Sequence, residues 1–421
     1  MKFLHAADVH LDAQLKGLEL HPGAPVERIR NATRDAFIRL IDLAIEEEVD
    51  FVVIAGDLFD RADAAMESWS RAIVEFQRLN EADIPVYLIR GNHDSLTANL
   101  GARKLHWPRN VFEFPAGAAT TFQLETLGVA LHGQSFGSQA EARDLAEQYP
   151  SPVPGAYNIG LLHTSLTGSS RHDTYAPTSP EVLTLKGYDY WALGHVHGRA
   201  TIREEPAIEF PGCTQGRHIN EPGAKGCLLV TVENRVTRSI EFRPLDTVRW
   251  LACDVELQGE EDEQDVYALV RQRLRELQAE QPDRLLAIRM TLRGQCGLHR
   301  AWQAADVVES LCGNIRSFAA ELQSVWIERI VIETRPPINL DQLRQSSDLL
   351  GELLRDIARL VNDPEADLTG FVEALKPVEA KAGTELPAAG IRLDDPELLR
   401  DWLRQAEGVI VAALAEGDDA I

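Results

Sequence analysis

Short apolar runs alternate with segments of helical periodicity in the first quarter of the chain. The runs at residues 3–7, 51–55 and 86–89 are apolar almost throughout, which is typical of strands covered on both faces. Between them, apolar residues recur every three or four positions over residues 37–45 and 69–79, which predicts two amphipathic helices. Three strands joined by helices indicate a sheet built from βαβ units.

Farther along, the strand candidates are shorter and are separated by turns. They lie at residues 112–114, 121–124, 129–132, 157–163, 190–194, 209–212 and 227–232. We expect these strands to complete a second sheet that packs on the first as a sandwich, with a functional site on the loops at one edge. The predicted fold class is therefore α/β, with the two sheets arranged as an α+β sandwich.

A change of pattern near residue 245 marks a domain boundary. After it, strands and helices alternate as a β-α-β-α-β unit, which predicts a small separate domain. The remainder is expected to be helical over residues 340–360 and 396–415, with a linker rich in Pro, Ala, Gly and Lys at residues 377–390. The predicted domains are residues 1–245, 246–336 and 337–421.

Polar side chains follow several of the predicted strands at the point where each strand ends. After residues 86–89 comes Gly91, which allows a turn that most residues resist, and then Asn92, His93 and Asp94. In open α/β sheets, ligands bind at the carboxyl ends of the strands. Four more stretches of this kind are Asp8-Val9-His10, Gly56-Asp57-Leu58-Phe59-Asp60, His163 and Gly194-His195-Val196-His197.

The candidate ligands at these strand ends are oxygen and imidazole donors, without a thiol. Such donors suit Mn²⁺, Mg²⁺, Fe²⁺ or Zn²⁺ rather than a cysteine-based structural site. Seven ligands exceed what one octahedral ion needs, so two ions are implied, with Asp57 as the candidate bridge. Two metals about 3.5–4 Å apart stabilise the attacking and the leaving oxygen of a phosphoryl displacement. The seven candidates are Asp8, His10, Asp57, Asn92, His163, His195 and His197.

Charge and composition narrow the class of protein. A chain of 421 residues with 44% hydrophobic and 26% charged residues is an ordinary globular protein. Its net charge of −24 argues against a generally basic nucleic-acid binder, so a nuclease would have to approach phosphates through metal ions and local arginines. Residues 266–335 contain more arginine than acidic residues. A solvated face is the alternative to a DNA track there.

Segments that would direct the chain to a membrane or out of the cell are not expected. No apolar run approaches the roughly 18 residues of a membrane span. The first predicted strand begins at Lys2, and no basic leader with an apolar run precedes it. The five cysteines are scattered, without a Cys-x-x-Cys pair, and fit reduced thiols. We therefore expect a cytoplasmic protein.

The order of these motifs resembles that of the calcineurin-like metallophosphoesterases. The sequence Asp-x-His, Gly-Asp-x-x-Asp, Gly-Asn-His-Asp, a lone His and Gly-His-x-His carries the resemblance, which covers roughly residues 1–230. Within the family, the chain is most similar to the SbcD-type DNA repair exonucleases and to their YhaO-like branch. Further support comes from the stretches at residues 31–37, 52–60, 193–197 and 211–218. The resemblance implies a four-layer double β-sheet sandwich, with the βαβαβ unit as a capping domain.

The resemblance also implies a role for each candidate residue. One ion would be held by Asp8, His10, Asp57 and His197, and the second by Asp57, Asn92, His163 and His195. His93 would bind no metal and would protonate or stabilise the leaving oxygen. Some relatives have a histidine where this chain has Asp60, so we expect Asp60 to orient a ligand histidine.

Several side chains keep a structural alternative. Asp94 either supports the ligands or caps a loop. Arg217 and His218 either touch a phosphate or stabilise the turn in which they lie. His163 alone would usually be a core histidine, but within the ordered set we interpret it as a ligand. The histidines outside the motifs are expected to be structural: His5, His21, His106, His132, His172 and His299.

The function expected from this resemblance is metal-dependent hydrolysis of DNA phosphodiester bonds, as an exonuclease and possible endonuclease with Mn²⁺. A phosphoesterase of small nucleotides or phosphoproteins is the alternative. The tail helices carry apolar stripes, and the resemblance implies that they dock on an SMC-like ABC ATPase. We expect the last helix to sit away from the globular body, where it is free to enter a partner's groove. Its folding back onto the chain's own capping domain is the alternative, and a homodimer is a further assembly to consider.

Overall fold

The computed structural model of the chain describes residues 1–13, 23–60, 66–96, 106–166, 175–259, 262–337, 340–363, 365–382 and 395–415, together with residues 386, 392 and 393. The chain forms two compact units. The first contains Met1–Glu256, Glu263–Arg293 and Ala304–Glu333, and the second contains Leu257–Asp262, Gly294–Gln303 and Thr334–Ile421. The three-domain division predicted from the sequence stays a prediction.

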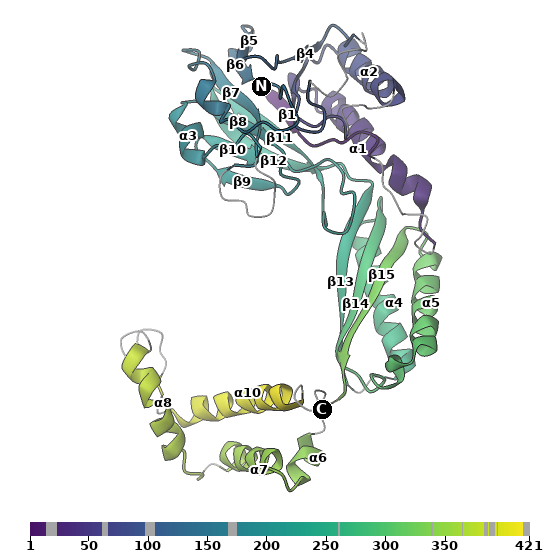
Figure 1. The fold of residues 1–421 in the computed structure, drawn as a ribbon, viewed down its shortest axis with the longest axis vertical. Coiled ribbons are helices and arrows are strands. Elements are labelled where there is room, and N and C mark those ends of the chain that lie inside the picture. The colour runs from purple at the N-terminus through teal and green to yellow at the C-terminus, as the bar shows by residue number, and fades with distance from the viewer. Residues whose placement is uncertain are drawn as a thin grey trace. The chain divides into compact units, whose positions relative to one another are not determined.

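The first of two six-stranded sheets is built around the N-terminal strands (Figure 1). Its order is β12-β11-β1-β2-β3-β4, in which β1 to β4 are parallel and β11 and β12 are antiparallel to their neighbours. Helices α1 and α2 bury their apolar stripes, including Phe37 and Phe76, against one face of this sheet. The bounds are β1 Lys2–Ala6, α1 Val26–Glu46, β2 Phe51–Ala55, α2 Met66–Glu81, β3 Val86–Ile89, β4 Val111–Glu113, β11 Gly226–Glu233 and β12 Val236–Pro244.

The second sheet has the order β5-β6-β7-β8-β10-β9 and packs on the first. Phe3 and Phe51 from the first sheet meet Tyr157 and Tyr190 from the second in the layer between them. Helix α3 and a 3₁₀ turn, η3, cover the outer face. These four layers confirm the predicted sandwich. The bounds are β5 Thr120–Leu124, β6 Val129–Gly133, η3 Ala146–Gln148, β7 Tyr157–His163, α3 Pro180–Leu185, β8 Tyr190–Gly194, β9 Ala200–Arg203 and β10 Ala207–Phe210.

Two strands expected in the second sheet belong to the first. β4 pairs with β3, and β11 pairs with β1, where Lys2 lies opposite Thr231 and His5 opposite Leu228. An apolar run indicates that a strand is buried, but it does not specify which edge the strand joins. Strands β9 and β12 were missed, because both are largely exposed and lack an apolar run.

A three-stranded sheet with two helices follows, as predicted. Its order is β13-β14-β15. Within the first unit, Trp250, Leu285 and Trp326 of this sheet pack against Ile29 and Ala32 of α1. The bounds are β13 Val248–Gln258, α4 Glu263–Glu280, β14 Leu285–Gln295, η4 Ala301–Gln303, α5 Ala305–Glu321 and β15 Val325–Arg335.

The tail differs from the prediction in where its helices begin and end. The single helix expected over residues 340–360 is two helices, because the Asp348 side chain caps a new helix by accepting from the Gly351 amide at 2.8 Å. Part of the predicted linker is also helical, since Pro377 lies inside α8, while residues 383–385 and 387–391 lie outside the described part of the chain. The bounds are α6 Leu340–Gln345, α7 Leu349–Asn362, α8 Thr369–Ala382 and α10 Pro396–Ala415.

The last helix packs within the tail. Leu399 and Leu403 of α10 are buried against Ile357 of α7 and Leu368, so the apolar stripes of these helices face one another. The last helix is therefore paired with another helix of the tail, while its expected separation from the globular body stays a prediction. No helix among the described residues has the length and apolar character needed to cross a membrane.

Candidate metal centre

The loops after five strands meet at one edge of the sandwich. The chain after β1 is hydrogen-bonded to the chain after β2, with the Asp8 amide 3.1 Å from the Gly56 carbonyl oxygen and the His10 amide 3.0 Å from that of Asp57. The His195 amide donates to Asp8 Oδ2 at 2.9 Å, which ties the loop after β8 to the same place. All seven predicted ligands are brought together by these loops.

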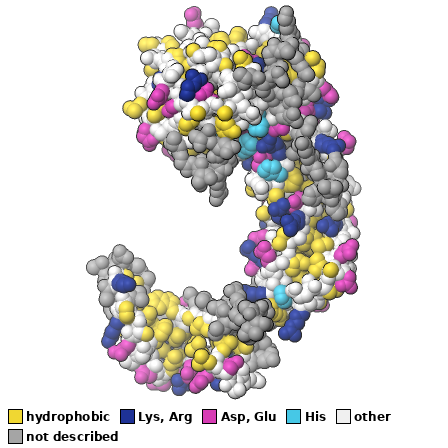
Figure 2. Space-filling model, in the orientation of Figure 1, with side chains coloured by type: hydrophobic (Ala, Val, Ile, Leu, Met, Phe, Trp, Pro, Cys, Tyr) yellow, Lys and Arg dark blue, Asp and Glu magenta, His cyan; other side chains and the backbone are white. Residues whose placement is uncertain are grey.

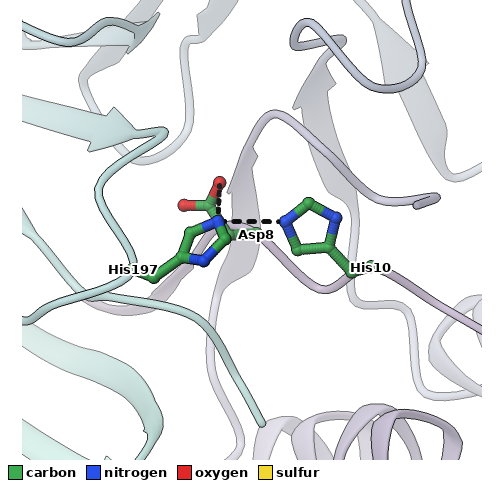
Figure 3. A group of neighbouring side chains, drawn as sticks. All are labelled: Asp8, His10 and His197. Atoms are coloured by element: carbon green, nitrogen blue, oxygen red, sulfur yellow. Dashed lines mark hydrogen bonds and ion pairs between the residues drawn. The ribbon is translucent and has the colours of Figure 1, made fainter. Parts of the chain in front are cut away.

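One cluster of donors contains Asp8, His10 and His197 (Figure 3). The Nε2 atoms of His10 and His197 are 3.1 Å apart, and His197 Nε2 is 3.8 Å from Asp8 Oδ1. Asp57 Oδ2 lies 4.0 Å from His10 Nε2. This is the set predicted for the first ion.

A second cluster lies on the other side of Asp57. His163 Nε2 is 2.9 Å from Asn92 Oδ1 and 3.4 Å from Asp57 Oδ2, and His195 Nδ1 is 3.2 Å from Asn92 Oδ1. Asp57 therefore reaches both clusters through the same oxygen. This matches the bridging position predicted for it, while the assignment of the seven side chains as ligands stays a prediction.

The backbone at this edge is held in an unusual conformation. Positive φ angles occur at Asp8 (51°), His10 (47°), Asp57 (51°) and His195 (96°). Such angles are uncommon for residues other than glycine and cluster at functional sites, where the surrounding structure maintains them. Four of the seven donors have this conformation.

The two sheets lie very close together next to these donors. Gly194, at the end of β8, leaves no room for a Cβ because the Ala55 carbonyl oxygen at the end of β2 occupies that space. The same oxygen accepts from His163 Nδ1 at 3.0 Å. The main chains of the two sheets are thus in direct contact at the site.

Comparisons with known proteins agree with this geometry. A family model described as calcineurin-like phosphoesterase matches residues 1–199, and one described as metallophosphoesterase YhaO, middle domain, matches residues 250–335. The uncharacterized metallophosphoesterase YhaO of Bacillus subtilis (strain 168) is 33% identical over 388 residues, which cover 89% of this chain and 90% of that protein. The chain belongs to the calcineurin-like phosphoesterases.

Shorter matches connect this phosphoesterase to DNA repair proteins. The DNA double-strand break repair protein Mre11 of Methanopyrus kandleri is 28% identical over 301 residues, which cover 64% of this chain and 62% of that protein. The Mre11 of Sulfolobus acidocaldarius is 30% identical over 207 residues, covering 47% and 50%. The family membership implies two divalent metal ions, which is the number predicted from the ligands.

The donor set of the phosphoesterase fits such ions. Two Nε2 atoms that face each other at 3.1 Å need a proton or a cation between them, and the neighbouring carboxylates supply negative charge. Burial raises the pKa of Asp57, but His163 and His10 outweigh it and hold that pKa well below its usual range. Burial, with help from Arg217, lowers the pKa of His10 to about 3, so this imidazole is a neutral donor.

His163 titrates in the opposite direction. Burial lowers its pKa, but the carboxylates of Asp57 and Asp8 outweigh burial and raise that pKa to about 9. Without a cation, His163 therefore carries a proton at neutral pH. A metal ion bound there would displace this proton, as ligand binding to a metal requires.

His93 lies beside the donors, as predicted for a residue that acts on the substrate. Its ring is 4.7 Å from that of His10 between centroids, and its side chain is 37% exposed. Its Nδ1 is 2.7 Å from the Asp60 carbonyl oxygen, and its amide donates to Asp57 Oδ1 at 2.9 Å. Since a carbonyl only accepts, Nδ1 carries the hydrogen there, and Nε2 is the nitrogen left to meet a substrate.

A carboxylate lies beside Nδ1 of each imidazole in the first cluster. His10 Nδ1 lies 3.3 Å from Asp60 Oδ1, the contact expected of a residue that orients a ligand histidine. His197 Nδ1 lies 2.7 Å from Glu221 Oε1. Sequence reasoning missed Glu221. Its only signal was a spacing of four residues from Arg217, which many surface ion pairs share.

Arg217 lies between these two carboxylates. Its guanidinium donates to Asp60 Oδ1 at 2.9 Å and to Glu221 Oε1 at 3.1 Å, and its amide donates to Glu221 Oε2 at 2.8 Å. The structure thus favours the structural alternative for Arg217. His218 is exposed, with Nε2 3.8 Å from Glu221 Oε1, and its contact with a phosphate stays a prediction.

Asp94 supports the site through the backbone. Its Oδ2 accepts from the Leu58 amide at 2.9 Å, and its Oδ1 accepts from the Gly91 amide at 2.8 Å. Burial, followed by the nearby charge of Asp57, raises its pKa to about 6. Of the two roles considered for Asp94, capping of loops is the one that the structure shows, and it joins the loops after β2 and β3.

The histidines outside the motifs have structural surroundings where they are described. His5 is buried between the sheets, 2.9 Å from Tyr190 Oη and 3.1 Å from the Leu193 carbonyl oxygen. His132 bonds to Thr121 and Asn158, and His299 to Thr334. His106 is exposed, while His21 and His172 lie outside the described residues.

Proposed function

We propose that this phosphoesterase is a metal-dependent DNA phosphodiesterase, an exonuclease with possible endonuclease activity. The observation that carries the proposal is the complete set of seven donors, with the partly exposed His93 beside it. Two divalent ions would supply the charge that stabilises a phosphoryl displacement. We propose Mn²⁺ as the metal, which is one of the ions, with Mg²⁺, Fe²⁺ and Zn²⁺, that carboxylate, amide and imidazole donors suit.

DNA as substrate is supported by the relatives named Mre11, whose names record double-strand break repair. The charge distribution of the chain supports DNA as a substrate less strongly than these relatives do. Arginines of the three-stranded domain are neutralised where they are paired: Arg289 with Glu328, Arg293 with Glu256 and Arg284 with Asp246. Together with the net charge of −24, this keeps a small nucleotide or a phosphoprotein as the alternative substrate.

Release of nucleotides from labelled DNA is the decisive assay. With Mn²⁺, we expect hydrolysis of duplex or single-stranded DNA, in parallel with hydrolysis of bis-p-nitrophenyl phosphate, and none with EDTA. Hydrolysis of the small ester without any release from DNA would contradict the nuclease and favour the small-substrate alternative. No hydrolysis of either would contradict a phosphoesterase activity under these conditions.

We further propose that the tail docks on an SMC-like ABC ATPase. Figure 2 shows hydrophobic side chains gathered over α7 and α10. Leu349 is 81% exposed and Leu353 is 39% exposed, although neighbouring positions of α7 are buried against α10. An exposed apolar row on an amphipathic helix fits the recognition mode in which a helix enters a groove of its partner.

Binding to a purified SMC-like ABC ATPase would test the tail. We expect Leu349→Glu with Leu353→Glu to weaken co-purification at least tenfold, because the substitutions place charge in an apolar interface. A chain ending at Pro387 should lose binding too, but that change also uncovers α7. Leu185→Glu is the control, since Leu185 is an equally exposed leucine (86%) on α3. Unchanged binding of the double variant would show that this face is not the docking element.

Two further proposals concern assembly and location. A homodimer is supported by the exposed apolar side chains Met66 and Val74 on α2. Action in the cytoplasm is supported by the five cysteines, all unbridged and four of them buried, which suit a reducing compartment.

A further inference from the structure

A cavity of about 640 Å³ opens at the edge of the sandwich opposite the metal centre. Its wall includes Tyr157, the first residue of β7, and Asp189, which directly precedes β8. The donors His163 and His195 stand at the other ends of these two parallel strands. The cavity is therefore separate from the site described above. Its volume lies in the range of roughly 300–1,000 Å³ that small-molecule sites have.

Glu209 is a buried carboxylate in the wall of this cavity. It lies on β10, where successive side chains alternate between the two faces of the sheet. Ile208 and Phe210 pack on the outer face, and Ala207 faces the layer between the sheets. Glu209 shares the face of Ala207 and is only 2% exposed. A carboxylate in this place costs free energy unless its charge is compensated.

The protein compensates this charge only in part. Thr201 Oγ1 donates to Glu209 Oε2 at 2.9 Å. Among the described residues, no basic side chain forms an ion pair with Glu209, and its Oε1 accepts no hydrogen bond. Burial raises the pKa of this carboxyl to about 7, although Thr201 and Arg199 oppose that rise. One oxygen of a buried carboxylate is thus left to accept a hydrogen bond from a ligand in the cavity.

The other charged residues of the wall favour a positive charge on that ligand. Glu204 and Glu205 lie in the turn between β9 and β10, and Asp189 is a further carboxylate. The two basic residues of the wall are Arg235 and Arg238, and the latter already pairs with a glutamate of β11 at 3.4 Å. Among the described residues, no three of these carboxylates come together as a possible metal site. An organic cation therefore fits the wall better than a metal ion.

The remaining wall suits an aliphatic stem. Tyr157, Tyr188 and Ile240 supply apolar surface, and an ammonium group supplies the hydrogen-bond donors that a carboxylate needs. We propose that this cavity binds a small aliphatic diamine, with one ammonium group at Glu209 Oε1 and the other near the glutamates of the β9–β10 turn. This ligand site does not depend on the proposed DNA hydrolysis.

Isothermal titration of the full-length chain with 1,4-diaminobutane tests the proposal. Salt at about 0.15 M screens the exposed carboxylates of this acidic chain, so that diffuse attraction adds little. The wild type should bind one molecule in a saturable step. Glu209→Gln keeps the shape of the side chain but removes its charge, and should weaken binding about tenfold or more. Ser239→Leu narrows the cavity from β12 with Glu209 intact, and should weaken binding as well.

The matched control is Glu125→Gln, at an exposed glutamate in the turn between β5 and β6 of the same sheet. Asn92→Ala, which changes the metal centre, is a second control, and neither should alter binding. Thermal unfolding checks that each variant is folded, and Ser239→Leu decides if Glu209→Gln is not. The proposal is overturned if the wild type shows no saturable binding or if Glu209→Gln binds as the wild type does. An equal loss in Glu125→Gln would overturn it too, because surface charge alone would then attract the diamine.

Discussion

Replacing His93 with glutamine is expected to lower turnover on DNA about 10²–10⁴-fold, the usual contribution of a positioned general acid. The imidazole lies beside the donors, and its Nδ1–H is engaged by the Asp60 carbonyl oxygen at 2.7 Å. Nε2 is therefore the atom that can give a proton to the leaving oxygen. A glutamine amide can occupy similar space and form hydrogen bonds, but it has no proton to transfer near neutral pH.

The leaving group provides the sharpest comparison for His93→Gln. A nitrophenolate leaves without protonation, so hydrolysis of bis-p-nitrophenyl phosphate should fall less than hydrolysis of DNA. Metal content should stay at the wild-type value, because His93 is not among the seven donors. His106→Gln is the control, since His106 is exposed and matches no motif. Activity on DNA within a few-fold of wild type would show that another residue or water is the acid.

Replacing Asp57 with asparagine is expected to have the largest effect on metal content. Asp57 Oδ2 is near both clusters, 3.4 Å from His163 Nε2 and 4.0 Å from His10 Nε2. Asparagine can still accept from the His93 amide, but its amide nitrogen would face the cations and cannot coordinate them. Chains reconstituted with Mn²⁺ should therefore lose the paired ions and fall below detectable hydrolysis.

Metal analysis of three chains checks this expectation. The wild type should approach two ions, Asn92→Ala about one, and Asp57→Asn fewer than the wild type with no coupled pair in its electron paramagnetic resonance spectrum. Asp83→Asn is the control, because Asp83 is an exposed turn residue whose positive φ asparagine tolerates. If the wild-type chain binds only one ion and Asn92→Ala binds the same amount, Asp57 does not bridge two ions.

The strands of the first sheet were predictable where burial requires a run of apolar residues. The strands around Val53 and Leu88 are covered on both faces and read as continuous apolar runs. The sequence of a strand does not specify which strand it pairs with, so β11 was expected in the wrong sheet. In the tail, two apolar stripes predicted two amphipathic faces correctly, but the stripe of α10 gave no sign that α7 would cover part of it.

The candidate site was also predictable only in part. The seven donors could be found because each follows a strand, and the ends of strands in such a sandwich converge. Glu221 lies on a loop, 24 residues after the histidine that it holds, and resembles any other acidic residue of the chain. Arg217 was noticed as a cation near a turn, but only the three-dimensional structure shows that two carboxylates hold it.

The contact between Gly194 and the Ala55 carbonyl oxygen fixes the spacing of the donors independently of how well the core is packed. Where two sheets meet through side chains, a larger or smaller core residue shifts them and changes every distance across the interface. Here the sheets touch through their main chains directly beneath the donors. Substitutions in the aromatic layer, at Phe51 or Tyr157 for example, can therefore change the free energy of unfolding. The main-chain contact still sets the distance between the two sheets at the donors.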